Sequence, residues 1–476
     1  MAEILVLGAG LNGLVTAMLL ARDGHSVTVL ERDDAAPGDD ADSVWRRWQR
    51  PGVNQFRQLH FMLPRWRAQM QHELPAVLEQ VIAFGGSRVN VVGALPADMS
   101  GGWRDGDERF ETVTARRPIL EAAAATVANR TDGVRIRRGV AVTGLLTGRR
   151  VIAAAPHVTG VVVDDGAELR ADLVVDATGR RSPVGSMVES AGGRRPREER
   201  EDSGFVYYAR HFRSTDGFHP AAMGTLLQHF ESLSVLTLPC DNSTWGVGFI
   251  TSARDKQLRG LRDTSSWLAA LKLFPTVAHW GDADPITDVQ VIAGIEDRYR
   301  RFVVDGEPVV TRLVAVGDAW ACTNPSLGRG ASIGMLHACA LRDLLREVDP
   351  DQPEKLVRRF DEITESTVTP LYRMTVAFDR HRLSEIAEDA AGEPCHTSDA
   401  SWAMSKALYA AAQHDPDVLR AYASVMSMLC TPQQALAAPG MVGMVLTLGA
   451  NAPRYPIPSP GRAELLSAIA DPGTPR

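Results

Sequence analysis

The first 31 residues constrain the fold most strongly, because they follow the order strand, glycine turn, helix, strand. The apolar run EILVLG is typical of a buried parallel strand, and the GAGLNG that overlaps its end places Gly8, Gly10 and Gly13 in a G-x-G-x-x-G spacing. An apolar helical pattern follows, and a second strand, SVTVLE, ends in Glu31. This order predicts a parallel α/β sheet whose glycine turn and helix N-terminus hold a pyrophosphate.

Glu31 favours a nucleotide-binding site over the alternative interpretation, a glycine turn that only packs a helix against a sheet. A carboxylate at the end of the second strand can accept hydrogen bonds from an adenosine ribose, whereas packing gives no reason for an acid there. The fingerprint alone leaves NAD and FAD as alternatives.

The parallel sheet is expected to be completed far along the chain, by an apolar strand at residues 311–319. Between the two ends, residues 203–252 alternate in the manner of an antiparallel sheet. From residue 331 onward the pattern is largely helical. A nucleotide fold interrupted by a second, sheet-containing domain is not the usual layout of an NAD dehydrogenase.

Composition excludes several classes of partner. The net charge is −7 without a long basic block, so neither nucleic acid nor an anionic membrane is expected as a partner. The apolar stretch at 440–450 is too short to span a bilayer, and no signal peptide is expected. The cysteines are scattered and odd in number, without a CxxC spacing, which predicts no metal site and a reducing, cytoplasmic location. They are Cys240, Cys322, Cys339, Cys395 and Cys430.

Four further segments resemble known families. DATGRRSP (176–183) and GDAWACTNPSLGRGAS (317–332) resemble the D-x-x-G and G-D motifs of FAD-dependent monooxygenases with the para-hydroxybenzoate hydroxylase fold. GVNQFRQLH (52–60) and SGFVYYARHFR (203–213) resemble, more narrowly, the lasalocid-type flavin epoxidases of polyether antibiotic biosynthesis. The family resemblance covers roughly residues 1–345.

The resemblance implies an α/β fold with a Rossmann-like FAD-binding domain of the GR2 type, an inserted antiparallel-sheet substrate domain and a helical C-terminal region. The expected boundaries are 1–80, 110–183 and 297–350 for the discontinuous FAD-binding domain, 81–109 and 184–296 for the substrate domain, and 351–476 for the helical region.

The resemblance also assigns cofactor residues. Asp318 is expected to accept a ribityl hydroxyl of FAD, and the helix that starts near Gly330 is expected to present its N-terminus to the flavin N1–C2=O edge, where reduced flavin is negative. The expected cofactor contacts are Gly8, Gly10, Gly13, Glu31, Arg32, Gln55, Arg57, Arg117, Val142, Asp176, Gly179, Asp318, Pro325, Gly328, Gly330, Ala331 and Ser332.

One motif departs from the family. The usual hydroxylase motif has D-G followed by Ser and Arg, whereas this chain has DATGRRS at 176–182. That motif is tied to both FAD and NADPH use. Direct reduction by NADPH or NADH and reduction through a separate flavin reductase therefore remain alternatives.

The implied chemistry is the insertion of one oxygen atom from O₂, through a flavin C4a-hydroperoxide, into an apolar, electron-rich substrate of secondary metabolism. Alkene epoxidation is favoured over aromatic hydroxylation because it needs no general base. His60 and His211 are weak candidates for a base, since each is more readily explained as a packing or orienting histidine. The residues expected in the substrate pocket are Phe205, Tyr207, His211, Trp245 and Trp320.

Other functions share this fold. Halogenases carry W-x-W-x-I-P and prenyl reductases carry Y-x-W-x-F-P, and the nearest segment here is STWGVGFI (243–250). A non-enzymatic escort for lipidated partners is a further alternative, and the intact loop at 328–332 argues against it. The substrate, the oligomeric state and the role of residues 351–476 are not predicted.

Overall fold

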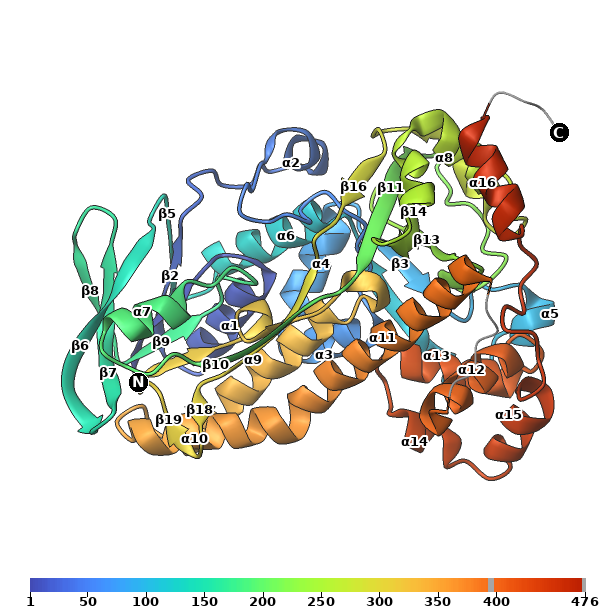
Figure 1. Cartoon of the computed structure of the whole chain (residues 1–476). Helices are drawn as coiled ribbons and strands as arrows, with labels where there is room; N and C mark the ends of the chain where they lie inside the picture. Colours follow the sequence, from blue (N-terminus) through green and yellow to red (C-terminus); the bar gives the residue numbers. More distant parts are fainter. Residues whose placement is uncertain (393–397, 473–476) are drawn as a thin grey trace.

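A five-stranded parallel sheet forms one end of the molecule, on the left in Figure 1. The structure is a computed structural model that describes residues 1–392 and 398–472. In spatial order, the strands are β20 (Leu313–Ala315), β9 (Leu173–Asp176), β1 (Glu3–Leu7), β2 (Ser26–Glu31) and β5 (Val134–Arg138). Every neighbouring pair is parallel. The chain leaves β1 toward β2 and adds β9 later on the other side, so the switch point, where α/β sheets bind ligands, lies between β1 and β9.

Both faces of the parallel sheet are covered. The covering elements are the helices α1 (Leu11–Arg22), α6 (Arg117–Asn129) and α9 (Gly330–Glu347) on one face, and the strands β6 (Val142–Ile152), β7 (Ala155–Val163) and β8 (Glu168–Arg170) on the other. Ile4 and Val6 of β1 pack into the helical core, whereas Leu5 and Leu7 pack against β7. This alternation buries β1 on both sides, which explains why its sequence is apolar throughout.

An antiparallel sheet lies at the other end of the molecule. Its strands are β12 (Leu227–Phe230), β13 (Leu233–Pro239), β14 (Thr244–Ser252) and β11 (Phe205–Arg213), with β15 (Asp284–Pro285) and β16 (Gln290–Ile292) both pairing with β11. Tyr208 and Phe212 of β11 join a core with helix α8 (Thr264–Leu271), while Phe205 and Tyr207 belong to a different core on the opposite face. The period-two alternation expected for residues 203–213 is therefore present in the structure.

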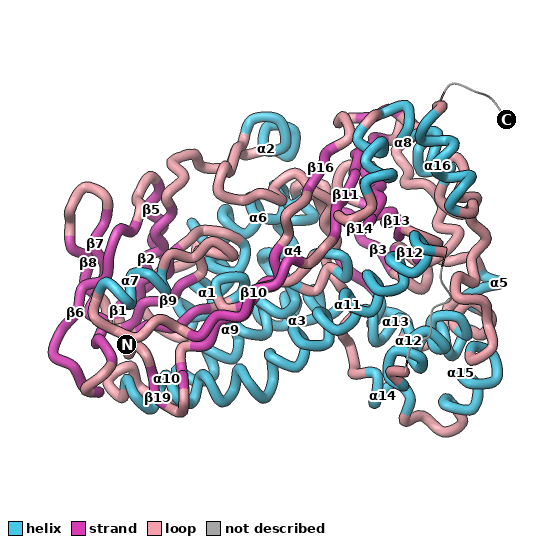
Figure 2. The backbone as a smooth tube through the Cα atoms, viewed as in Figure 1, coloured by secondary structure: helices cyan, strands magenta, loops and turns pink. Residues whose placement is uncertain are grey.

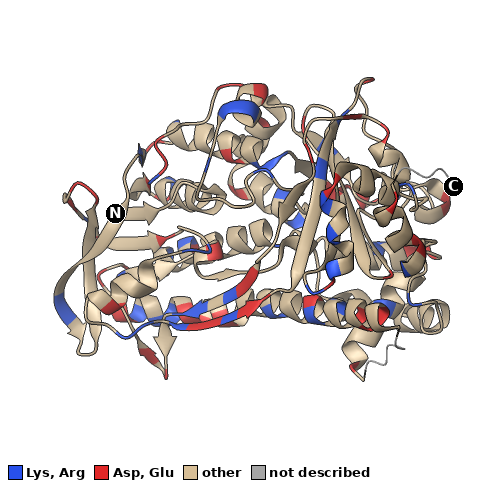
Figure 3. Cartoon of the chain, turned by 45° about the horizontal axis from the view of Figure 1, so that its top comes forward, with Lys and Arg blue, Asp and Glu red and all other residues tan. Residues whose placement is uncertain are grey.

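Two long strands connect the sheets, as Figure 2 shows. They are β10 (Arg197–Asp202) and β17 (Glu296–Arg301), which pair antiparallel over six residues, with β21 (Ala321–Cys322) beside β17. Arginine and acidic residues are interspersed along this ribbon, which is striped red and blue in Figure 3. Glu199 pairs at 2.6 Å with Arg373 of α11 (Thr369–Ala391). Such exposed pairs each contribute little, so the ribbon holds mainly through its backbone hydrogen bonds.

The C-terminal region is helical, as expected; its first helix lies against α9, and later helices pack around the antiparallel sheet. Its helices are α10 (Pro353–Ile363), α11, α12 (Ala400–Ala411), α13 (Pro416–Met426), α14 (Pro432–Leu436), α15 (Met441–Gly449) and α16 (Arg462–Ala470). Helix α16 lies on α8, and Leu465 and Ile469 share the core with Trp267. The remaining elements are α2 (Ala41–Arg47), α3 (Pro64–Glu73), α4 (Pro75–Ala83), β3 (Ser87–Asn90), α5 (Ala97–Ser100), β4 (Glu111–Thr114), α7 (Val184–Ser190), β18 (Val303–Val304) and β19 (Glu307–Pro308).

Three further expectations concern the chain as a whole. The strand expected at 311–319 is shorter, because Gly317 takes a φ of +58° and starts a 3-10 turn directly after β20. In the described part of the chain, Cys240, Cys322, Cys339 and Cys430 are free, and Cys395 lies outside it. No helix within residues 1–392 and 398–472 combines the length and apolarity needed to cross a bilayer.

Candidate functional site

A cavity with a volume of about 490 Å³ extends from the carboxyl ends of the parallel strands to the antiparallel sheet. At one end it is lined by Gly8, Glu31 and Val142, and at the other by Tyr207, Leu236 and Leu238. The C-terminal helix α13 closes the second end with residues that include Tyr422 and Met426. The cavity therefore joins the predicted nucleotide site to the apolar face of the second sheet.

The glycine turn after β1 has the close packing that its sequence predicts. Gly8 has a φ of +100°, and a Cβ there would lie 2.8 Å from the carbonyl oxygen of Ala177. A Cβ on Gly13 would lie 2.0 Å from the carbonyl oxygen of Gly8. A Cβ on Gly10 would meet no atom within 4 Å, because Gly10 borders the cavity. Gly10 is also the N-cap of α1, so the open side faces the end of a helix that favours anions.

Glu31 lines the cavity and is held in place by buried partners. Its Oε2 accepts the backbone N–H of Ala9 at 2.8 Å and an N–H of Arg50, and its Oε1 accepts the N–H of Asp33 at 3.0 Å. Arg50 is 6% exposed and also pairs with Asp33 at 3.2 Å and with Glu121 at 2.6 Å. The carboxylate is thus fixed at the carboxyl end of β2, where it can accept hydrogen bonds from a ribose.

The buried acid Glu121 connects Arg50 to the middle of the cavity. Arg117 donates to Glu121 at 2.7 Å, and its second guanidinium nitrogen lies 3.3 Å from Nε2 of His60. Although burial alone would raise it, the guanidiniums of Arg117 and Arg50 hold the pKa of Glu121 below its usual value. Burial, and then the charge of Arg117, lower the pKa of His60 to about 3, so this ring is neutral at physiological pH.

The second glycine-rich stretch meets the first across the cavity floor. A Cβ on Gly317 or Gly334 would lie 2.5 Å or 2.2 Å from the side chain of Asn12, which inserts from the first turn of α1. Asp318 lines the cavity and accepts no hydrogen bond within the described residues. Gly330 starts α9 and borders the cavity, and a Cβ there would meet no atom within 4 Å. A free carboxylate and an open helix N-terminus thus face the same space.

Most of the expected cofactor residues line this cavity. Those that do are Gly8, Gly10, Glu31, Arg32, Gln55, Arg117, Val142, Gly179, Asp318, Pro325, Gly328, Gly330 and Ala331. Arg57 lies behind the wall, where it donates to the carbonyls of Trp45 and Trp48. Asp176 is fully buried and accepts hydrogen bonds from Thr178 and Ser182, so it braces the turn that carries Gly179. Gly13 and Ser332 also lie behind the wall.

The expected substrate residues divide in the same way. Tyr207 and Trp320 line the cavity, whereas Phe205, His211 and Trp245 do not. Trp245 points to the opposite face of the sheet and donates from Nε1 to the carbonyl of Trp280 at 2.8 Å. His211 is 1% exposed and packs against Trp45 at a centroid distance of 5.3 Å. Burial, and then the charge of Arg116, lower the pKa of His211 to about 3.

Sequence reasoning missed several residues of the site. Arg50 belongs to no recognised motif. The only signal for it in the sequence is that it ends the tryptophan- and arginine-rich segment WRRWQR. Tyr422 and Met426 come from the C-terminal region, whose role was not predicted. Asp379 of α11 sits behind the apolar end of the cavity, and only its position within a long helix could have been read from the sequence. None of the described residues forms a cluster that could hold a metal ion.

The residues present fit an FAD. The cradle left open by Gly10 and Gly330, the fixed carboxylate of Glu31 and the free carboxylate of Asp318 lie along one cavity. Burial, and then the charge of Asp318, raise the pKa of the Cys322 thiol to about 12, so this cysteine is not activated for covalent attachment.

The N-terminal part of the chain is similar in sequence to FAD-dependent enzymes. Residues 3–104 match the family of FAD dependent oxidoreductases. Protein Rv3254 of Mycobacterium tuberculosis is 27% identical over 400 residues, which are 79% of each chain.

The fold is similar to those of several solved structures, among them a probable FAD-dependent monooxygenase. PqsL, a probable FAD-dependent monooxygenase from Pseudomonas aeruginosa, superposes with a TM-score of 0.59 at 16% identity over 81% of this chain and 99% of its own. The oxygenase of 2-methyl-3-hydroxypyridine-5-carboxylic acid superposes with a TM-score of 0.53 at 16% identity, over 82% of this chain and 93% of its own. A flavoprotein/dehydrogenase from Cytophaga hutchinsonii superposes with a TM-score of 0.58 at 17% identity, over 94% of this chain and 98% of its own.

Proposed function

We propose that the protein is an FAD-dependent monooxygenase that inserts one oxygen atom from O₂ into an apolar, electron-rich small molecule. The observation that carries the proposal is one cavity that joins the dinucleotide turn, Glu31 and Asp318 to an apolar wall of the antiparallel sheet. The family match over residues 3–104 and the fold shared with monooxygenases support it.

The cofactor end of the cavity would bind and orient FAD. When bound, FAD supplies the activation of O₂ and the delivery of one oxygen atom. Glu31 would hold the adenosine ribose, the N-terminus of α1 the pyrophosphate, and Asp318 a ribityl hydroxyl. The N-terminus of α9, which is 18 residues long, would stabilise negative charge beside Gly330 through its unpaired N–H groups and its dipole.

The substrate end of the cavity would exclude water and position an apolar molecule. Its wall is mainly aliphatic and aromatic, and is formed by Leu226, Leu227, Leu236, Leu238, Ile292, Leu327, Tyr422 and Met426. Helix α13 covers this end, so the C-terminal region would act as a wall that keeps the reacting groups dry.

We favour alkene epoxidation, which needs no general base, because a pKa of about 3 makes His60 and His211 too weakly basic to deprotonate a phenol. Aromatic hydroxylation is the second candidate. It is favoured by two hydroxyl groups on the cavity wall, on Tyr207 and Ser326, and by the hydroxypyridine named for one of the structural neighbours.

Reduced nicotinamide would supply the electrons, either directly to the bound flavin or through a separate flavin reductase. Oxidation of NADPH and NADH by the purified holoenzyme distinguishes the two routes. Oxidation that requires an added reductase would assign the second route.

The test begins with the visible spectrum of the purified protein, which should show non-covalently bound flavin. Turnover of candidate polyenes and phenols under ¹⁸O₂ should then place one labelled oxygen atom in the product. Asp318→Ala, which removes the free carboxylate, serves as the flavin-deficient control. A protein that binds no flavin after incubation with excess FAD would refute the proposal. A product that is hydrogenated or halogenated would move the chain to the prenyl reductases or halogenases of the same fold.

A further inference from the structure

Two hydroxyl groups at the apolar end of the cavity converge on one buried carboxyl group. Tyr207 of β11 and Ser326, in the 3-10 turn Pro325–Leu327, both line the cavity. The Tyr207 hydroxyl donates to Oδ1 of Asn324 at 2.7 Å, and the Ser326 hydroxyl donates to Oδ1 of Asp379 at 2.9 Å. Nδ2 of Asn324 donates to the same Asp379 oxygen at 3.2 Å. These contacts form a polar cluster in an otherwise apolar wall.

Asp379 is placed where a charged carboxylate is disfavoured. It is 2% exposed, and its Oδ2 has no hydrogen-bond partner in the described part of the chain. An ionised carboxylate with one bare oxygen would be costly at such depth, whereas a neutral carboxylic acid would cost far less. The position therefore favours a carboxyl group that carries a proton at neutral pH.

The charged groups around Asp379 come from two other elements. Asp297 of β17 accepts the N–H of Asn324 at 2.7 Å, and Arg329, the N-cap of α9, is 5% exposed. Burial first, and then the charge of Asp297, raise the pKa of Asp379 to about 8, against the hydrogen bonds from Asn324 and Ser326 and the charge of Arg329. Burial also holds the pKa of Tyr207 well above its usual value, so its hydroxyl keeps its proton.

The hydrogen-bond directions complement a hydroxyl group on a ligand. The Tyr207 proton is committed to Asn324, so the lone pairs of its oxygen are available to accept a ligand O–H. When Asp379 carries a proton on Oδ1, it can donate to Ser326, whose hydroxyl then turns to donate to the ligand oxygen. A hydroxyl satisfies both residues at once, whereas a hydrocarbon satisfies neither.

We propose that Tyr207 and Ser326 bind a hydroxyl group of the substrate and that Asp379 exchanges a proton with it through Ser326. This inference rests on the proposed function, and it narrows the substrate class to apolar molecules that carry a hydroxyl. Tyr207 and Ser326 touch the ligand, whereas Asn324 and Asp379 act through them and are positioning residues. In the base direction, Asp379 is ionised and Ser326 donates to it, so the ligand O–H turns from Tyr207 to Ser326. The ligand proton then passes to Ser326 as the proton of Ser326 passes to the Asp379 carboxylate. No electrons are transferred, and the acid direction is the reverse.

The binding experiment uses holoenzyme without reductant, so that no turnover occurs. 1-Naphthol and 1-methylnaphthalene are a matched pair of aromatic ligands with and without a hydroxyl. Their dissociation constants are measured from the change in flavin absorbance. We expect 1-naphthol to bind wild-type protein at least about tenfold more tightly, on the scale of one lost hydrogen bond in a buried site. Ser326→Ala and Tyr207→Phe should each remove most of this preference and leave the binding of 1-methylnaphthalene unchanged.

The proton exchange is tested by pH. For a phenol that the enzyme turns over, kcat/KM in wild type should rise about tenfold per pH unit and level off near pH 8, because the base form of Asp379 exists only above its pKa. Asp379→Asn keeps the shape but cannot titrate, so this inflection should disappear. Glu388→Gln, on the more exposed side of α11, is the matched control and should retain it.

The outcomes separate this inference from the proposed function. Equal affinity of wild type for both naphthalenes, preferences unaltered in Ser326→Ala and Tyr207→Phe, or an inflection that persists in Asp379→Asn would each overturn it. Absence of flavin, or of any oxygen insertion by wild type, would instead refute the proposed function. If Asp379→Asn does not fold, the ligand preferences of the two hydroxyl variants still decide.

Discussion

Breaking the buried ion pair between Arg116 and Asp241 should cost about 3–5 kcal/mol of the free energy of unfolding, the range for a buried pair that loses one partner. The pair joins the start of α6, in the cofactor half, to the turn between β13 and β14. Both side chains are 0% exposed. The backbone N–H and Nε of Arg116 donate to Oδ1 of Asp241 at 2.8 Å and 3.0 Å, and Nη2 donates to Oδ2. Asp241→Asn removes the charge and leaves a guanidinium whose remaining close contact is the ring of Trp45, at 4.3 Å.

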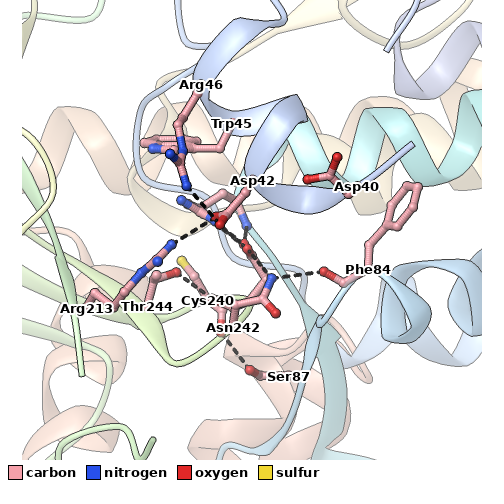
Figure 4. Close-up of polar contacts among 12 residues, drawn as sticks. Asp40, Asp42, Trp45, Arg46, Phe84, Ser87, Arg213, Cys240, Asn242 and Thr244 are labelled. Atoms are coloured by element: carbon pink, nitrogen blue, oxygen red, sulfur yellow. Dashed lines mark hydrogen bonds and ion pairs between the residues drawn. The ribbon is translucent and has the colours of Figure 1, made fainter. Parts of the chain in front are cut away.

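The matched control is the neighbouring pair of Asp42 and Arg213, which Figure 4 shows beside Arg46. Their side chains are 46% and 39% exposed and the N···O distance is 3.2 Å. Asp42→Asn should therefore cost no more than about 1 kcal/mol, because an exposed pair is screened by water and salt.

Urea denaturation followed by tryptophan fluorescence measures both variants. A third variant, Arg116→Met with Asp241→Leu, removes both charges. It should be less destabilised than Asp241→Asn, since no buried charge is left without a partner. Equal losses in Asp241→Asn and Asp42→Asn, or a double variant that loses more than the single one, would refute the reasoning.

Three further predictions concern the cofactor site and pH. Asp318→Ala should lose most bound flavin in absorbance measurements, whereas Asp176→Ala, behind the cavity wall, should lose less; equal losses would contradict the placement. Gly330→Val should weaken FAD binding by more than about 1 kcal/mol by filling the cradle, and Gly443→Val, in α15 away from the cavity, should not. Burial lowers the pKa of His337 to about 3. The unfolded state therefore takes up its proton first as the pH falls below about 6.5, and stability should fall by about 1.4 kcal/mol per pH unit, down to about pH 3. His337→Gln should reduce that slope in denaturation curves measured between pH 6 and pH 4.

The sequence by itself determined the parallel sheet and the cofactor end of the cavity. Gly8, Gly10 and Glu31 lie within one strand–turn–helix–strand unit, and the regular geometry of that unit brings Glu31 beside the glycine turn. Asp318 and Gly330 follow the same logic after β20. A turn without room for a side chain can be recognised from the sequence, because only glycine fits at a position such as Gly8.

Only the tertiary structure determined which polar side chains pair with one another and which residues line the substrate end of the cavity. Arg50 reaches Glu121 across 71 residues, and Ser326 reaches Asp379 across 53. The alternation of β11 predicted that Tyr207 and His211 share a face, yet only Tyr207 reaches the cavity, because Trp45 packs over the ring of His211. Contacts of this kind depend on how distant elements pack, and no local spacing encodes them. The acid that could titrate at the cavity was therefore invisible in the sequence, since its pKa is set by burial and by Asp297 rather than by neighbours along the chain.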